Sequence, residues 1–396
     1  MKRIISMLMV LLLCCSLCTP VLAADHVQPV MAAGFFQNLF GGGKDALELV
    51  GEALEKKKTK VTIKYDDWLE TGYSWDDVYA VLGDRLNDTP ETIHVNIRKV
   101  SFVTYEPKKG DPYIDLNLAY FEDFPAQLNG EMTKLAAQKI LDKIPAGASD
   151  WEIAHFVHDE LIRTVTYVEN EYDQTAYGAL VEGEAICNGY AMAFEYVMDM
   201  AGIPCDTVVG YTDWYNAWLA GSQFLVDDSV RHAWNVLTLT GDDGVDRQYY
   251  VDVTWDDMDW EDADGEAYII HDWFCLDQES IEYAGRQNIY HPDGLEQWDF
   301  TDESMDYYVH TGTRVQEYDL NAIAEIMKQQ MDAGKNTLSI NMGDMDHYYD
   351  IEVPMRSFGG LQKLIGKLDL GSVRYLFTND DYGGILSLHL FLNAPD

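Results

Sequence analysis

Two stretches of alternating residues flank a turn-forming segment, and this arrangement most constrains how the chain can fold. The first stretch covers residues 231–239 and the second covers residues 248–255. The segment between them contains Gly241-Asp242-Asp243-Gly244, a composition typical of turns. The pattern therefore predicts two antiparallel strands joined as a β-hairpin.

The register of this hairpin decides which side chains face each other. If Leu239 pairs with Val245, the same register places His232 directly opposite Asp252, on one face, with their Cβ atoms about 5 Å apart. A slip of one residue would put the two side chains on opposite faces. In the predicted register the carboxylate can fix the tautomer of the imidazole and stabilise its charged form. The alternative is a structural hairpin that exposes both side chains.

A cysteine between two glycines precedes a strongly apolar helical pattern. Gly183 and Gly189 flank Cys187, apolar residues then recur with helical spacing over residues 190–201, and Gly202 follows. A thiol at a helix N-terminus lies where the helix dipole favours a thiolate and where unpaired N–H groups can bind an oxyanion. Because Cys187 also falls on the apolar stripe of the helix, a buried and inert cysteine is the alternative.

These segments resemble the core of the transglutaminase-like superfamily, and its bacterial and kyphoscoliosis-peptidase-like branches are the most similar. The resemblance extends over about residues 130–300 and keeps the order Cys, His, Asp. The motifs that carry it are Gly183–Ala191, Ala201–Pro204, Val209-Gly210, His232–Asn235 and Asp252–Asp257, with Phe156–Asp159 and Val165–Tyr167 before them and Asp272–Phe274 after them.

The resemblance implies an α+β fold with a papain-like transglutaminase core and a Cys-His-Asp triad. Cys187 would be the nucleophile, His232 the general base and acid, and Asp252 the orienting carboxylate. Attack on an amide carbonyl would give a thioester, which water resolves in a peptidase and an amine resolves in a cross-linking transglutaminase. The backbone N–H of Cys187 would contribute to the oxyanion hole.

Four further side chains are candidates for the same site. Gln174 and Tyr177, which lie upstream of the cysteine, are the oxyanion-hole candidates. Tyr190 and Trp234, which lie next to the triad residues in sequence, are the candidates for lining the substrate pocket.

The patterns on either side of this core are similar to each other. A helical pattern and strand patterns at Val61–Tyr65, Ile93–Ile97 and Ile114–Leu118 precede the core, and a helix followed by two strands comes after it. We therefore predict two small α/β modules that flank the core. The predicted divisions are a signal peptide at 1–23, an N-terminal arm and helix at 24–58, a small α/β domain at 59–127, a catalytic domain at 128–305 and a C-terminal α/β domain at 310–396.

The N-terminus predicts secretion. Lys2 and Arg3 precede the apolar stretch Met7–Leu13, and small residues end the segment at Ala23-Ala24, as in a secretory signal peptide. No later stretch approaches the ~20 apolar residues of a membrane span. The net charge of −41 becomes two units more negative when the signal peptide leaves. Repulsion from phosphate groups then argues against a nucleic-acid partner.

Three cysteines remain in the mature chain, namely Cys187, Cys205 and Cys275. Cys205 and Cys275 lie on apolar segments and are either core residues or one disulfide. His155 and His158 are three residues apart on a predicted helix but lack the glutamate spacing of zinc proteases, so no metal site is expected. No nucleotide-binding motif is present, and no cofactor is expected.

The sequence thus predicts a secreted enzyme that is extracellular or associated with the cell surface. It would transfer acyl groups of peptide-bound amides through a thioester, with a protein or peptide substrate. The alternative is a cell-envelope or matrix interaction module that retains the fold without catalysis.

Overall fold

The computed structural model describes the larger part of the chain. The described residues are 46–71, 78, 99–105, 107, 109–120, 126–212, 230–241, 243–283, 286–290, 299–343, 348–378 and 387–394. The predicted signal peptide, the arm that follows it and the predicted strand Ile93–Ile97 lie outside these residues. The chain divides into two compact units between Asn129 and Gly130, and each is described by itself.

The first unit contains a three-stranded antiparallel sheet in which the last strand is central. Its strands are β1 (Lys60–Lys64), β2 (Ser101–Tyr105) and β3 (Tyr113–Asn117), in the order β1-β3-β2, and its helices are α2 (Ala46–Glu55) and α3 (Tyr65–Thr71). Val61 and Ile63 of β1 are buried while the other three residues of the strand are exposed, so one face of this strand packs on the core. The predicted strands at Val61 and at Ile114–Leu118 are confirmed, whereas β2 was not predicted.

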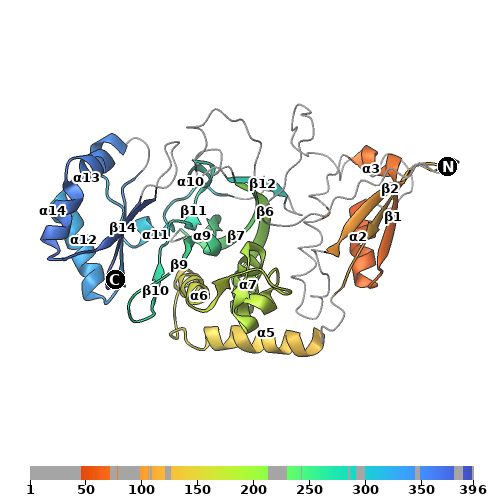
Figure 1. Cartoon of the computed structure of the whole chain (residues 1–396), viewed down its shortest axis with the longest axis horizontal. Coiled ribbons are helices and arrows are strands. Elements are labelled where there is room, and N and C mark those ends of the chain that lie inside the picture. Colours follow the sequence, from red (N-terminus) through yellow and green to blue (C-terminus); the bar gives the residue numbers. More distant parts are fainter. Residues whose placement is uncertain are drawn as a thin grey trace. The chain divides into compact units, whose positions relative to one another are not determined.

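The second unit is built on a five-stranded antiparallel sheet. Its strand order is β11-β8-β7-β6-β12, where the strands are β6 (Cys205–Thr212), β7 (Val230–Thr240), β8 (Asp246–Val251), β11 (Phe274–Leu276) and β12 (Arg286–Tyr290). Three long helices precede the sheet in sequence, α5 (Ala126–Leu141), α6 (Asp150–Thr164) and α7 (Cys187–Ala201). In Figure 1, α6 and α7 lie below the strands, and α7 packs against both β6 and β7. Helices followed by an antiparallel sheet make the fold α+β, as predicted.

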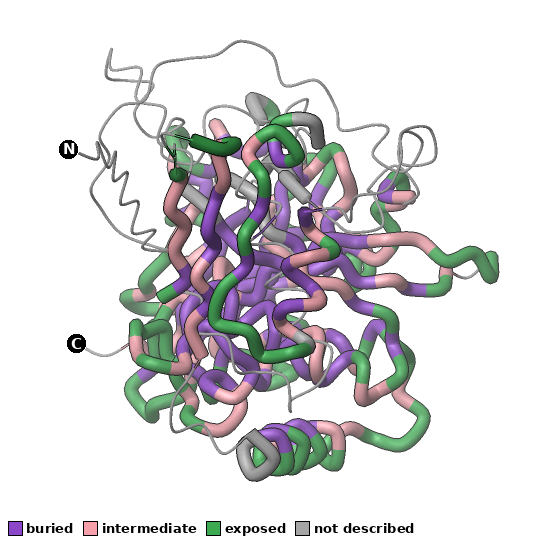
Figure 2. The backbone as a smooth tube through the Cα atoms, turned by 90° about the vertical axis from the view of Figure 1, so that its right-hand side faces the viewer, coloured by how far each residue is buried: buried purple, intermediate pink, exposed green. Residues whose placement is uncertain are grey.

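Local sequence signals set the ends of the two central helices. Ser149 accepts a hydrogen bond from the backbone N–H of Glu152, and the Glu152 carboxylate accepts the backbone N–H of Ser149 in return. This capping box begins α6 where the sequence predicted a helix start. Gly202, in the left-handed conformation with a φ of 80°, ends α7. All residues of α7 from Cys187 to Phe194 are buried, so this helix lies in the interior of the unit, where Figure 2 shows mostly buried backbone.

Short elements connect the helices to the sheet. They are β4 (Thr166–Tyr167), which pairs with β5 (Glu184–Ala185), the π-helical turn η3 (Gly178–Glu182), α9 (Val253–Asp256), the hairpin of β9 (Asp257–Glu261) and β10 (Ala267–Ile269), and α10 (Gln278–Tyr283).

The C-terminal part of the second unit has its own apolar core and sheet. Its helices are α11 (Tyr307–His310), α12 (Leu320–Asp332), α13 (Val353–Ser357) and α14 (Gly360–Lys367), and the π-helical turn η6 (Tyr348–Glu352) precedes α13. Its strands are β13 (Thr337–Asn341), β14 (Arg374–Thr378) and β15 (Ser387–Phe391), and their order in the sheet is β13-β15-β14. The helix and the two strands predicted after the core are confirmed as α12, β13 and β15. The boundaries of the predicted domains stay predictions.

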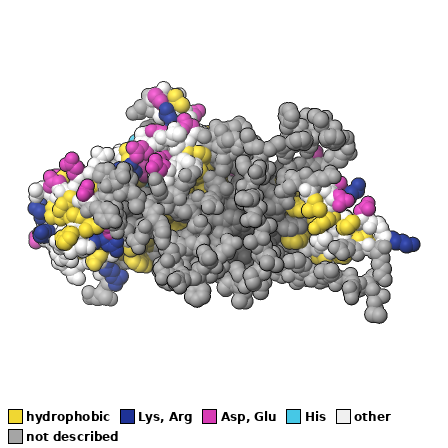
Figure 3. All heavy atoms as spheres, turned by 90° about the horizontal axis from the view of Figure 1, so that it is seen from above, with side chains coloured by type: hydrophobic (Ala, Val, Ile, Leu, Met, Phe, Trp, Pro, Cys, Tyr) yellow, Lys and Arg dark blue, Asp and Glu magenta, His cyan; other side chains and the backbone are white. Residues whose placement is uncertain are grey.

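The described surface carries charges of both signs, and no described helix is long and apolar enough to cross a membrane. On the face in Figure 3, Asp and Glu side chains are interspersed with Lys and Arg side chains.

A buried carboxylate joins the part of the second unit that holds the five-stranded sheet to this C-terminal part. Asp272 is 1% exposed, and it accepts hydrogen bonds from the Tyr308 hydroxyl at 2.5 Å, from the Thr378 hydroxyl and from Nε2 of His389 at 3.1 Å. Thr378 and His389 belong to β14 and β15, so one side chain of the core holds two strands of the C-terminal sheet.

We predict that Asp272→Ala lowers the free energy of unfolding by about 3–5 kcal/mol, because two buried polar groups and the half-buried Thr378 hydroxyl lose their acceptor at once. Chemical denaturation followed by circular dichroism measures the change. Asp264→Ala is the matched control, since Asp264 is exposed and only its backbone N–H takes part in the bond to Asp262. Equal stability of the two variants would contradict the anchoring role of Asp272.

Candidate active site

The hairpin of β7 and β8 has the predicted partners but a different register. Leu239 pairs with Arg247 and Thr240 pairs with Asp246, so the expected pairing of Leu239 with Val245 is wrong by two residues. The reason lies in the turn: the Gly241 N–H donates to the Val245 carbonyl, and Asp243 accepts the N–H of Val245. Val245 is therefore part of the turn. An even shift preserves the face of every side chain.

His232 and Asp252 meet despite this shift. Nε2 of His232 lies 2.7 Å from Oδ2 of Asp252, and the two side chains are 8% and 2% exposed. In the observed register they are diagonal neighbours and not a directly opposed pair. A buried contact of this length is a strong, charge-assisted hydrogen bond.

The strand predicted to reach Trp255 ends at Val251, because Asp252 starts a helix. Oδ1 of Asp252 accepts the backbone N–H of Trp255 at 3.2 Å and caps the short helix α9. The same carboxylate thus binds the end of a helix with one oxygen and an imidazole with the other. Its position is fixed from both sides, so it can hold the His232 ring in one orientation.

Aromatic rings complete the surroundings of His232. The imidazole stacks on Trp234 with a centroid separation of 5.9 Å and meets the edge of Trp255 at the same separation. Neither ring carries a charge, and the Asp252 carboxylate provides a charged partner for this imidazole.

Cys187 occupies the first position of α7, as predicted. Its side chain is 2% exposed, and the residue before it, Ile186, provides no side-chain cap. Helix α7 packs on β7 and on α9. The Tyr190 hydroxyl, one turn into α7, donates to Asp257 at 2.6 Å, just beyond the end of α9. The helix turn that carries the thiol is therefore tied to the short helix that Asp252 caps.

The loop that holds Gln174 packs against this same turn. The Asp173 carbonyl accepts the N–H of Ile186 at 2.9 Å, and the Asn188 side chain donates to the Gln174 carbonyl at 2.8 Å. Gln174 is 6% exposed, and within the described part of the chain its side-chain amide has no hydrogen-bond partner. Buried amides are rarely left unsatisfied. The backbone carbonyl of Gln174 is bound by Asn188 in the first turn of α7, and the sequence predicted an oxyanion donor at Gln174.

The other three candidates are placed as follows. Tyr177 is half-buried at the start of η3, and its ring meets the edge of Tyr172 at 5.5 Å. Tyr190 and Trp234, expected to line a substrate pocket, are instead core residues that are 0% and 1% exposed. Trp234 packs with Val236, Tyr250 and other apolar residues. These large side chains therefore fill the core and do not line an open surface.

Cys205 and Cys275 are buried thiols, and no disulfide joins them. Burial raises the pKa of both thiols well above the usual range. Of the two alternatives for these residues, the structure thus shows core residues.

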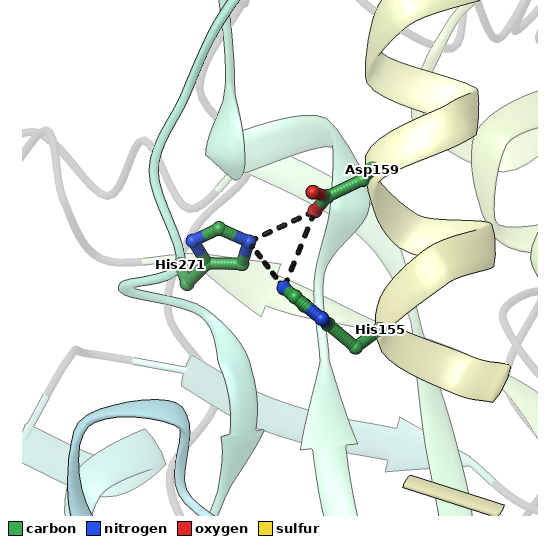
Figure 4. Close-up of side chains that lie close together, drawn as sticks. All are labelled: His155, Asp159 and His271. Carbon is green, nitrogen blue, oxygen red and sulfur yellow. Dashed lines mark hydrogen bonds and ion pairs between the residues drawn. The ribbon is translucent and has the colours of Figure 1, made fainter. Parts of the chain in front are cut away.

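A second polar cluster, which the sequence did not predict, lies between α6 and the segment after β10. His155, Asp159 and His271 point toward one another (Figure 4), with Nε2 of His271 3.0 Å from Nε2 of His155 and 2.8 Å from Oδ1 of Asp159. Burial lowers the pKa of His155 to about 4 and that of His271 to about 3. The i, i+4 spacing of His155 and Asp159 on a helix was a visible signal, whereas His271 is distant in sequence.

His158, the other histidine singled out from the sequence, points elsewhere. Its Nε2 bonds Asp256 at 3.1 Å and its Nδ1 bonds Asp159 at 3.2 Å. Burial lowers the pKa of His158, but the two carboxylates outweigh burial and raise it to about 9. Because both of its nitrogens are engaged, His158 does not pair with His155 as a metal ligand.

Comparison with known proteins agrees with the architecture. Residues 137–259 match the family described as the transglutaminase-like superfamily, so the chain contains a transglutaminase-like domain. No curated protein matches the chain.

Similar solved structures include a TGase (11% identity, 38% of this chain and 44% of that chain, TM-score 0.25) and a candidate cysteine protease of Cytophaga hutchinsonii (13%, 43% and 65%, 0.24). A candidate protease of Parabacteroides distasonis is 15% identical over 43% of this chain and 40% of that chain, with a TM-score of 0.22. The chain spans less than two thirds of each of these structures.

We predict that Gly189→Ala lowers the free energy of unfolding by about 1–3 kcal/mol, because overpacking forces the Gln174 loop away from α7. An added Cβ would lie 2.8 Å from the Ala185 Cβ and closer still to the Asp173 carbonyl oxygen. Thermal and chemical denaturation measure the change.

Gly366→Ala is the matched control, since Gly366 is also helical and an added Cβ there meets nothing within 4 Å. This control should be unchanged or more stable by up to ~1 kcal/mol. If Gly189→Ala behaved like it, the loop would not be held against the helix as described.

Proposed function

We propose that the transglutaminase-like domain catalyses cysteine-dependent acyl transfer on peptide-bound amides through a thioester intermediate. The observation that carries the proposal is the buried 2.7 Å contact between His232 and Asp252, made by a carboxylate that also caps α9. Such a contact orients an imidazole for proton transfer. The position of Cys187 at the N-terminus of α7 supports its role as nucleophile.

Each group then has one task. Because Nε2 of His232 faces Asp252, Nδ1 is the nitrogen that exchanges a proton with the thiol. The Cys187 sulfur attacks the amide carbonyl carbon, and the C–N bond breaks as the imidazolium gives its proton to the leaving amine. Water or a second amine then attacks the thioester and releases the thiolate, with His232 taking the incoming proton.

The Gln174 amide and the Cys187 backbone N–H are the proposed oxyanion donors. Gln174 is held next to the first turn of α7 by the Asn188 side chain, and its amide has no partner among the described residues. An N–H already in place, with no hydrogen bond to break, stabilises charge that develops in the transition state without a cost of reorganisation.

The proposed site of action is outside the cell. The basic head, apolar centre and small-residue exit of residues 1–23 support secretion. The acidic composition favours solubility and disfavours binding to nucleic acid. A protein or peptide at the cell surface is therefore the proposed substrate.

A second candidate function is a cell-envelope or matrix interaction module that keeps the fold without turnover. The burial of Cys187, at 2% exposure, is the observation that favours it. The two functions differ in one accessible property, the reactivity of the Cys187 thiol.

We predict that iodoacetamide alkylates one thiol per folded chain below pH 7, and that this thiol is Cys187. Cys205 and Cys275 should react only after denaturation, because burial raises their pKa. Peptide mapping by mass spectrometry identifies the labelled residue. Equal and slow labelling of all three cysteines would favour the interaction module.

We predict that Asp252→Asn reduces acyl transfer by about 10³-fold or more, the scale expected when the orienting carboxylate of a triad is removed. The assay mixes the chain from Ala24 onward with a peptide library and a labelled primary amine. Mass spectrometry then separates hydrolysed from amine-labelled peptides.

Two variants frame this result. Cys187→Ala should abolish both products, and Asp264→Asn, at an exposed position, should retain activity. Activity that survives in Cys187→Ala would contradict the nucleophile, and full activity of a folded Asp252→Asn would contradict the triad.

A further inference from the structure

The cluster of His155, Asp159 and His271 has a geometry that hydrogen bonds alone satisfy poorly. Nε2 of His271 faces Nε2 of His155 at 3.0 Å and Oδ1 of Asp159 at 2.8 Å, and the remaining side of the triangle measures 3.7 Å. A single N–H on His271 can reach both neighbours only as a bifurcated hydrogen bond, which is poorly aligned with each of them. If His155 donates instead, the lone pair of His271 faces a carboxylate oxygen. If a cation lay between them, Nε2 of His155, Nε2 of His271 and Oδ1 of Asp159 could each direct a lone pair toward it, and all three short separations would be explained.

We propose that His155, Asp159 and His271 bind a divalent first-row transition metal ion such as Zn²⁺. Two imidazole nitrogens and one carboxylate oxygen form a donor set typical of zinc and related ions. Two ligands at 2.0–2.1 Å from a tetrahedral metal are about 3.3–3.4 Å apart, and the three observed separations lie on either side of this value. The three ligand atoms all lie within 4.8 Å of one another.

Neighbouring groups hold the three side chains in place. Arg163 binds the second oxygen of Asp159 at 3.1 Å, so Oδ1 faces His271 at 2.8 Å and also Nδ1 of His158 at 3.2 Å. The His271 ring stacks on Tyr307 at 3.9 Å, and the His155 ring stacks on Trp151 at 5.0 Å. Support of this kind, from an outer layer of stacking and hydrogen bonding, orients metal ligands and raises affinity.

The cluster is accessible to a metal ion from solvent. Asp159 and His271 line a cavity of about 610 Å³, and His155 and Asp159 line another of about 420 Å³. The His155 side chain is 26% exposed. Three protein ligands beside an open cavity leave a coordination position for water, as in zinc sites with three protein ligands.

The metal would act where the core meets the C-terminal part of the unit. His155 and Asp159 belong to α6, and His271 directly precedes Asp272, which binds His389 of β15. An ion bound by the folded chain and not by the unfolded chain therefore stabilises this junction by mass action.

The test is titration of the full chain with Zn²⁺ and with Co²⁺ in a Cys187→Ala background, so that the candidate catalytic thiol cannot bind the metal. Calorimetry should give one ion per chain, and the Co²⁺ visible spectrum should show nitrogen and oxygen ligands without a sulfur-to-metal band. The midpoint of thermal unfolding should rise with metal concentration.

His155→Ala should weaken binding by at least about 100-fold, beyond the effect of losing an outer-layer contact. His310→Ala is the matched control, since His310 is exposed and also stacks on Trp151, at 4.1 Å, but lies outside the cluster. Asp159→Asn provides a second variant that keeps the shape of the side chain. Absence of binding in the Cys187→Ala chain, or equal binding by folded His155→Ala and His310→Ala, would overturn the proposal.

Discussion

The carboxylate of Asp252 is the point on which the candidate active site depends. One oxygen caps α9 by accepting the Trp255 N–H, and the other accepts the His232 imidazole. Because the side chain is almost fully buried, each bond is made in a low-dielectric environment in which an unpaired charge would be costly. The end of strand β8, the start of α9 and the orientation of the imidazole are thus set by a single side chain. The turn of α7 that bears Cys187 is then joined to α9 through Tyr190 and Asp257.

Much of this could be predicted because it is local. The capping box at Ser149, the glycine at the end of α7 and the alternation along β7 each depend on residues close in sequence. The contact of His232 with Asp252 was predicted with the wrong register, since the turn takes in Val245. It was still found because an even shift keeps both side chains on one face. When a turn can close in more than one way, the sequence therefore predicts the sheet face of a side chain more reliably than its partner on the opposite strand.

The features that were missed depend on tertiary contacts. Tyr190 and Trp234 were expected at a pocket, yet their rings fill the core, since periodicity does not distinguish a functional aromatic side chain from one that packs. The cluster of His155, Asp159 and His271 needs α6 to meet a segment more than a hundred residues later. Nothing near His271 in sequence reveals that partner. Likewise the buried Gln174 amide has a sequence signal only through its closeness to the cysteine.

The sheets β1-β3-β2 and β13-β15-β14 differ in one polar residue on the central strand, and this residue has a different partner in each sheet. Val61 pairs with Leu116 and Ile63 with Ile114 in the first unit, just as Leu338 pairs with Leu390 and Ile340 with Leu388 in the second. Between these pairs in the first unit, the Thr62 hydroxyl donates to Asp115, and Lys60 lies 2.5 Å from the same carboxylate. In the second unit, the Ser339 hydroxyl bonds Nδ1 of His389. All residues of β13 and β15 are buried, while β1 alternates between buried and exposed. In the first sheet, the central-strand Asp115 is paired with the exposed Lys60. In the second sheet, the central-strand His389 bonds the buried Asp272, which lies outside the sheet. Pairing with a buried acid makes His389 an internal contact of the second unit. The contact of His389 with another element thus accompanies the burial of both faces of the central strand β15, whereas β14 stays partly exposed.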